Sequence, residues 1–311
     1  MPARIISISL ACWLVAAWAS AQTLQQLQQR LGAGKAAPAT PNAPAGRGAD
    51  VQLVEKPWEQ ITDQQLFEHG KTALGQNPSK WHHAETEHFV IHFHKRTDAQ
   101  KVARQAEFYY EQVKKDLQAE KDRFDRKSHI FLFEKEPEWQ QFIADAELEE
   151  WFAGVSIRSE LFFHTRQHSG DFASNLLAHE MTHCIFYRFV PKRIPMWLNE
   201  GFAEFESGAA YAKFKGIGGG NRGSGRSGQA DYPLQKLLTV REYPKDRDDV
   251  REFYRTSERL VRFLMTKLDR NRFVPLVMKI ADGASLESAV LEIHADKFKS
   301  FDEFVKRYEK S

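Results

Sequence analysis

His179-Glu180-Met181-Thr182-His183 is the first of two stretches that are most informative about the fold and the chemistry of this chain. The second follows soon after it and reads Trp197-Leu198-Asn199-Glu200-Gly201-Phe202-Ala203-Glu204. Residues i and i+4 of a helix lie on one face, so His179 and His183 can direct their rings at a common ion. Glu180 lies about 100° further around the helix axis, so its carboxylate stays free. The first stretch therefore predicts a helix that presents a chelating pair of imidazoles beside an unbound acid.

The residues around the first stretch favour a helix. Apolar residues recur there at helical spacing, Asp171 or Ser174 can cap its start, and Pro191 ends it. The alternative interpretation is a core helix whose histidines bond to backbone carbonyls. The second stretch favours the metal site over that alternative.

The second stretch supplies the remaining ligand. Pro195 fits the first turn of a helix predicted over Met196 to Ser207, because a first-turn residue needs no backbone donor. A sharp turn would return Glu200 to the histidines, and three protein ligands leave the fourth tetrahedral position for water, as in catalytic Zn²⁺ sites. Glu204 can accept the other ring N–H of a liganding histidine, and Asn199 can act similarly. An exposed acidic pair at Glu200 and Glu204 is the alternative.

The paired motifs resemble those of the gluzincin metallopeptidases, the thermolysin and aminopeptidase relatives, and most closely the peptidase MA-like domains of secreted bacterial proteins. The resemblance covers roughly Glu87 to Gly283, and the words Trp-Leu-Asn-Glu-Gly-Phe-Ala are specific to the aminopeptidase side. It implies that His179, His183 and Glu200 bind zinc. It also implies that Glu180 is the general base, which takes a proton from a metal-activated water and passes it to the leaving amine.

Two features depart from the aminopeptidase pattern. Sixteen residues separate His183 from Glu200, slightly fewer than in the well-known aminopeptidases. The Gly-Ala-Met-Glu-Asn strand with which those enzymes hold a substrate's free amine is missing, and Ala153-Gly154-Val155-Ser156 stands at about its place. We therefore expect an endopeptidase rather than an aminopeptidase.

Other polar side chains are candidates for supporting roles. The place of Tyr254 resembles that of the aminopeptidase tyrosine that stabilises the oxyanion, and a tyrosine packed on an amphipathic helix is the alternative. His164 or His168, upstream of the histidine helix, can fill the same role. His92 and His94 share one face of a strand at a spacing that can bind metal, but we expect them to be solvent-facing edge residues.

The fold class that we expect is α+β. A zincin-like domain, with a small mixed sheet and an edge strand before the histidine helix, is followed by a mainly helical C-terminal lobe. The expected elements before that helix are a helix near Trp58 to Leu74, strands at His88 to Phe93 and His129 to Phe133, a helix at Asp98 to Lys121, a helix from Pro137, and a hairpin formed by Phe152 to Ile157 and Leu161 to Thr165. An extended peptide substrate can pair with such an edge strand through its backbone.

The chain divides into three parts. Residues 1–21 combine Arg4, an apolar run and Ala19-Ser20-Ala21, which is typical of a cleaved signal peptide and predicts a secreted or periplasmic protein of the bacterial cell envelope. Residues 22–51 hold a Gln/Leu segment and a flexible linker rich in Ala, Pro and Gly. The resemblance implies that residues 52–311 form a peptidase MA-like domain, in which we expect Gly216 to Gly228 to be either a flap or a disordered insertion.

The composition of the chain argues against some classes of binding partner. The chain has 44 Lys and Arg against 42 Asp and Glu, interspersed, so we expect no nucleic-acid partner. No segment after the signal peptide is expected to span a membrane. The expected partner is a peptide or protein substrate, and the oligomeric state stays open. The alternative is a catalytically lapsed zincin-fold protein that binds peptides or cell-wall polymer, but Glu180 favours the enzyme, because an acid beside an open metal position has little purpose in a binder.

Overall fold

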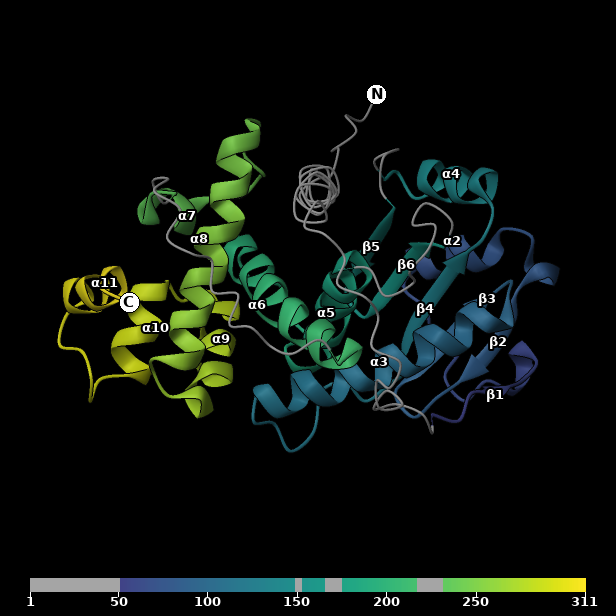
Figure 1. The fold of residues 1–311 in the computed structure, drawn as a ribbon, viewed down its shortest axis with the longest axis horizontal. Helices are drawn as coiled ribbons and strands as arrows, with labels where there is room; N and C mark the ends of the chain where they lie inside the picture. The colour runs from purple at the N-terminus through teal and green to yellow at the C-terminus, as the bar shows by residue number, and fades with distance from the viewer. Residues whose placement is uncertain (1–50, 149–152, 166–174, 217–231) are drawn as a thin grey trace, which may run out of the picture.

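The fold is that of a computed structural model, which describes residues 51–148, 153–165, 175–216 and 232–311 (Figure 1). Several predicted features lie outside these residues. They are the signal peptide, residues 22–50 of the linker segment, Phe152, His168, the two candidate caps Asp171 and Ser174, and residues 217–228 of the glycine-rich loop.

The chain forms a mixed α/β structure around one sheet. The sheet has six strands in the order β1-β2-β3-β4-β6-β5. The strands are β1 (Val54–Glu55), β2 (His82–Glu85), β3 (Phe89–Phe93), β4 (Ser128–Phe133), β5 (Gly154–Ile157) and β6 (Glu160–His164). β3, β4 and β6 run parallel, whereas β1, β2 and β5 pair antiparallel with their neighbours. The two predicted strands and the predicted hairpin are confirmed, and the hairpin places β5 at the edge of the sheet.

Helices cover both faces of the sheet and continue to the end of the chain. They are α2 (Glu68–Gly75), α3 (Arg96–Asp116), α4 (Glu136–Asp145), α5 (Asn175–Phe189), α6 (Met196–Lys215), α7 (Leu234–Thr239), α8 (Arg247–Thr266), α9 (Phe273–Ala281), α10 (Leu286–Ile293) and α11 (Phe301–Glu309). From Met196 onward the described residues form only helices and loops, so the helical C-terminal part is confirmed. Among the described residues, none of these helices combines the length and the apolar character needed to cross a bilayer.

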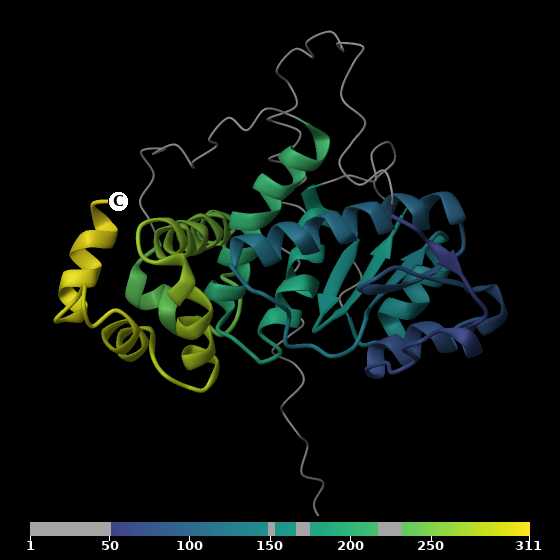
Figure 2. The same ribbon diagram turned by 90° about the horizontal axis from the view of Figure 1, so that it is seen from below.

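The sheet separates two groups of buried side chains. The larger core joins one sheet face to α3, α5 and the C-terminal helices, and α3 crosses that face in Figure 2. The smaller core joins the other face to α2 and α4 through aromatic side chains such as Phe131, Trp139 and Phe162. Alternate residues of β4 enter opposite cores, as the two-residue period of a strand requires. The histidine helix α5 therefore lies against the larger core, between the sheet and the C-terminal helices (Figure 1).

Two expectations about the N-terminal half are wrong. Trp58 to Leu74 is not one helix: a short 3-10 turn covers Trp58–Gln60, and α2 begins only at Glu68. The backbone between them bonds to distant acceptors instead, because Thr62 N donates to Glu85 and Phe67 N to Glu160. These long-range bonds replace the helical ones.

The expectation that His92 and His94 are solvent-facing edge residues is also wrong. β2 pairs with the outer side of β3, so β3 is an interior strand and His92 is fully buried. His94 follows the end of β3, and its ring stands 4.4 Å from the ring of Trp81, between centroids. The sequence around β2 carries no strong strand pattern, and its pairing decides the surroundings of His92.

The position of α6 depends on a close approach to α8. A Cβ placed on Gly201 would lie 2.3 Å from the carbonyl oxygen of Ser257, which is shorter than any normal contact. Only glycine therefore lets the α6 backbone lie this near α8. α6 runs past the predicted Ser207 to Lys215 and ends where Gly216 adopts a left-handed conformation with a φ of 65°.

Candidate metal centre

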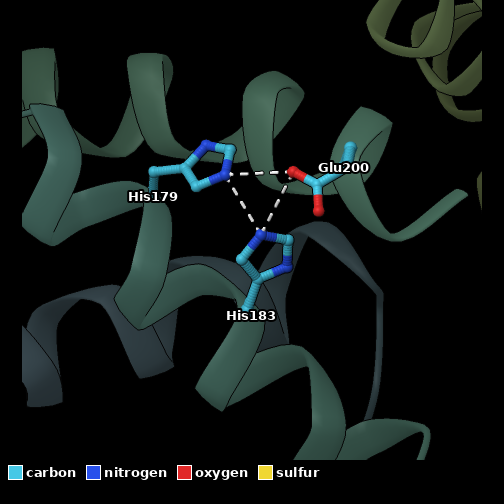
Figure 3. Close-up of side chains that lie close together, drawn as sticks. All are labelled: His179, His183 and Glu200. Atoms are coloured by element: carbon cyan, nitrogen blue, oxygen red, sulfur yellow. Dashed lines mark hydrogen bonds and ion pairs between the residues drawn. The ribbon is translucent and has the colours of Figure 1, made fainter. Parts of the chain in front are cut away.

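Three side chains from two consecutive helices converge. His179 and His183 lie one turn apart on α5, and Glu200 lies near the start of α6, with the three side chains directed at one another (Figure 3). Glu200 Oε2 lies 3.3 Å from His179 Nε2 and 3.5 Å from His183 Nε2, and the two Nε2 atoms are 3.1 Å apart. Among the described residues, this is the only group of three or more side chains spaced to hold a metal ion.

The spacing fits zinc. Ligand atoms bonded at about 2.0–2.1 Å to a tetrahedral ion lie about 3.3 Å from one another, close to the three separations found here. Two imidazole nitrogens and one carboxylate oxygen are also a donor set that zinc accepts. Zinc, or another divalent transition metal, bound to these three residues would have three protein ligands and one coordination position left for water.

Two prolines mark the turn between α5 and α6. α5 ends at Phe189, two residues before Pro191 as predicted, and α6 begins after Pro195, whose carbonyl accepts hydrogen bonds from Leu198 N and Asn199 N. Phe186 of α5 stacks on Phe202 of α6, with ring centroids 3.9 Å apart. The stacked rings pack the two helices together and so hold the carboxylate of α6 opposite the imidazoles of α5.

Tyr243 holds the other oxygen of Glu200. Its hydroxyl donates to Glu200 Oε1 at 2.6 Å, and both side chains are buried. Tyr243 lies in the loop between α7 and α8, outside any helix or strand. No sequence pattern identifies this residue, because a loop position has no periodicity that could connect it with Glu200 and only the tertiary fold brings the two together.

Glu204 lies beside the far side of one imidazole. Its Oε1 is 3.2 Å from His179 Nδ1, within ion-pair distance, which is the placement expected for a carboxylate that sets the tautomer of a liganding histidine. Asn199 is partly exposed on the same helix, and no hydrogen bond joins its side chain to His179 or His183 within the described part of the chain. Its supporting role stays a prediction.

Glu180 lies beside the three converging side chains without joining them. Its Oε2 accepts a hydrogen bond of 3.0 Å from Ser156 N, on the edge strand β5. Burial raises the pKa of Glu180 above its usual value, although the nearby His179 and His183 act in the opposite direction. A carboxylate with a raised pKa is a better proton acceptor at neutral pH than an ordinary surface glutamate.

The charges of the three residues are strongly coupled. Burial alone would lower the pKa of His179, but the carboxylates of Glu200 and Glu204 raise it well above its usual value. Burial alone would raise the pKa of Glu200, but His183 and His179 hold it well below its usual value. In the absence of an ion the site therefore favours an ionised glutamate beside a protonated imidazole, and a metal cation would take the place of that proton.

The candidates for stabilising an oxyanion lie in different places. The ring of Tyr254, on α8, lies 6.5 Å from the ring of His179 and stacks on the ring of Tyr243, with centroids 5.9 Å apart. His164 does not support the alternative, because it lies on the other face of the sheet, stacked on Trp139 and 3.3 Å from Glu136. The role of Tyr254 stays a prediction.

Comparison of the chain with models of known protein families and with curated proteins found no match. The residues and the geometry of this site therefore provide the basis for proposing a function.

Proposed function

We propose that this chain is a secreted zinc-dependent metallopeptidase of the gluzincin type, a zincin-like enzyme that hydrolyses peptide bonds with Glu180 as the general base. The observation that carries the proposal is the convergence of His179, His183 and Glu200 at tetrahedral spacing, with Glu180 outside the ligand set. The predicted signal peptide supports secretion. The four residues belong to the two sequence motifs that resemble those of the gluzincin metallopeptidases.

The residues around the three ligands support hydrolysis. When bound, zinc supplies Lewis acidity, which lowers the pKa of water from 15.7 towards about 7 and polarises a carbonyl. Glu180 would accept the proton of the attacking water at its carboxylate and return it to the leaving amine. Glu204 would hold the ring of His179 in the orientation and tautomer that leave Nε2 free.

The edge strand β5 supports a peptide as the substrate. β5 pairs with β6 on one side, and none of the described strands pairs with its other side. Ser156 N points from this open side to the carboxylate of Glu180. An extended backbone that paired with β5 would therefore lie beside the proposed base, and such pairing binds peptides with little dependence on their side chains.

The variant Glu180→Gln tests the proposal. Glutamine keeps an acceptor for Ser156 N and leaves the three ligands intact, but its amide cannot take a proton from water. We expect about one zinc per chain in both proteins, and turnover of a peptide library that is about 10²–10⁴-fold lower in the variant. Metal analysis and library cleavage by the purified chains give the two measurements.

Three outcomes contradict the proposal in different ways. Equal turnover by both proteins would remove Glu180 from the mechanism. Zinc in both proteins without turnover in either would favour a binding protein for peptides or cell-wall polymer. Absence of zinc from the wild-type protein would remove the metal centre itself.

A further inference from the structure

We propose that Tyr243 is a positioning residue that reserves one oxygen of Glu200 for the metal ion and so keeps the fourth coordination position open. This inference rests on the proposed function only in requiring that the site binds a metal. It concerns the coordination of that metal and does not require a particular substrate.

The two carboxylate oxygens of Glu200 have different partners. Tyr243 donates to Oε1 at 2.6 Å, while Oε2 faces both imidazoles at 3.3 and 3.5 Å. A carboxylate can bind a metal through one oxygen or through both. If both oxygens bound, the second would occupy the position that a catalytic site keeps open for water.

The hydroxyl of Tyr243 is restricted to this role by its surroundings. Only 6% of the surface of Tyr243 is exposed, and its ring packs edge-on against Phe253 and face-on against Tyr254, with centroids 5.7 and 5.9 Å apart. Because two aromatic neighbours hold the ring, the hydroxyl oxygen cannot move away from Glu200 without repacking. The fixed position of this oxygen therefore sets the rotation of the Glu200 carboxylate.

The ring of Tyr254 lies beside that of Tyr243. The two rings are stacked with centroids 5.9 Å apart, and the ring of Tyr254 lies 6.5 Å from that of His179. The tyrosine that we predict as the oxyanion donor therefore packs directly against the tyrosine that holds Glu200.

The test compares Tyr243→Phe with the wild-type protein and with Tyr232→Phe. Tyr232 provides a matched control, because its ring also packs edge-on against Phe253, at 6.1 Å, while its other close partner is the ammonium of Lys236, 4.6 Å from the ring centroid, and not a metal ligand. Both variants lose one buried-ring hydroxyl from the same lobe. Zinc affinity is measured by competition with a chelator, and coordination is read from the visible absorption of the Co²⁺-loaded protein.

We expect Tyr243→Phe to bind zinc about 10–100-fold more weakly, as is typical when a partner of a metal ligand is removed. Its Co²⁺ absorption should also be weaker than that of the wild type, because cobalt that gains a fifth ligand absorbs less than tetrahedral cobalt. Tyr232→Phe should match the wild type in both measurements. X-ray absorption of the zinc-loaded wild type should find four-coordinate metal, and this measurement needs no variant to fold.

The outcomes separate this inference from the proposed function. Equal affinity and an unchanged cobalt spectrum for Tyr243→Phe would reduce Tyr243 to a packing residue and leave the peptidase proposal standing. Five-coordinate zinc with both oxygens of Glu200 bound in the wild type would overturn the inference in the same way. Absence of metal binding by the wild type would overturn both proposals, whereas binding without peptidase activity would leave the role of Tyr243 intact.

Discussion

At the scale of single residues, Gly201 shows how the position of Glu200, a proposed metal ligand, depends on the neighbouring residue. It follows Glu200 directly, and its missing side chain lets α6 approach the Ser257 carbonyl of α8. The atom that a Cβ would meet belongs to the backbone of a helix, so it cannot move aside as the end of a long side chain can. Any larger residue at 201 would have to displace α6, and with it Glu200.

We expect Gly201→Ala to destabilise the protein by about 1–3 kcal/mol, the usual cost of overpacking a well-packed contact. Gly208 on the same helix provides the control, since nothing lies within 4 Å of a Cβ placed there. Gly208→Ala should be neutral or stabilising by up to about 1 kcal/mol, because alanine favours a helix more than glycine does. Urea unfolding of both variants measures the difference, and equal stability would show that the α6–α8 contact relaxes easily.

Residue types and spacing were enough to predict part of the site. His179, Glu180, His183 and Glu200 belong to two short motifs on helices, where spacing along the chain translates directly into position in space. The structure places Glu204 beside His179 as expected, at 3.2 Å. Tyr243 could not be predicted, because its contact with Glu200 spans forty-three residues of the chain and depends on how α7 and α8 pack.

At the scale of secondary-structure elements, the sheet face that carries α2 and α4 also holds a chain of histidines. His92 on β3 contacts His83 on β2 and His129 on β4, with 2.9 Å between the ring nitrogens in each case. The ring of Trp58 lies 5.6 Å from that of His92, between centroids. Burial, together with the neighbouring imidazoles of His129 and His83, holds the pKa of His92 well below its usual value.

We expect His92 to remain neutral in the folded protein at mildly acidic pH, where the imidazoles of the unfolded chain take up protons. Its pKa is lowered by folding, so below about pH 6.5 the unfolded chain takes up a proton that the folded chain does not. The contribution of His92 to stability is therefore fully present above about pH 6.5 and declines as the pH falls. Titration of the imidazole signals by nuclear magnetic resonance provides the measurement, with the chain in denaturant as the control that titrates near pH 6.5.

A midpoint for His92 near that of the denatured chain would contradict this account of the histidine chain. It would mean that water or a carboxylate stabilises the charged ring. The result would not affect the proposed metal centre, because α5 lies against the other face of the sheet.

At the scale of the whole molecule, the candidate metal centre lies between two halves of the structure. α5 packs on α3 and β5, on the side of the sheet, and α6 packs on α8, on the side of the C-terminal helices (Figure 1). Because α5 supplies two ligands and α6 the third, an ion bound to all three would join both halves. Metal binding and global stability should therefore be linked.

We expect zinc at 100 times its dissociation constant to stabilise the folded protein by about 2.7 kcal/mol and to raise Tm by roughly 5–10 °C. A chelator should reverse the effect, and His183→Ala should abolish it. Mg²⁺ at the same concentration should leave Tm unchanged, because it prefers oxygen ligands to imidazole. Thermal unfolding followed by circular dichroism measures these shifts, and a Tm that is independent of zinc would contradict the linkage.

The sequence by itself determined the elements with a strong local signal. Periodicity, proline positions and motif spacing predicted the interior strands β3 and β4, the hairpin before α5, and the helices that carry His179, His183 and Glu200. All three signals act between residues that are close together in the sequence. The histidine pair in particular needs only one helix to form.

Only the tertiary structure decided the rest. The segment from Trp58 to Leu74 breaks because Glu85 and Glu160 offer it distant hydrogen-bond acceptors, and His92 is buried because β2 adds to the sheet beside it. The hydroxyl of Tyr243 reaches Glu200 because α8 packs against α6. Each of these outcomes depends on contacts between residues far apart in the chain, whose energies no local pattern contains.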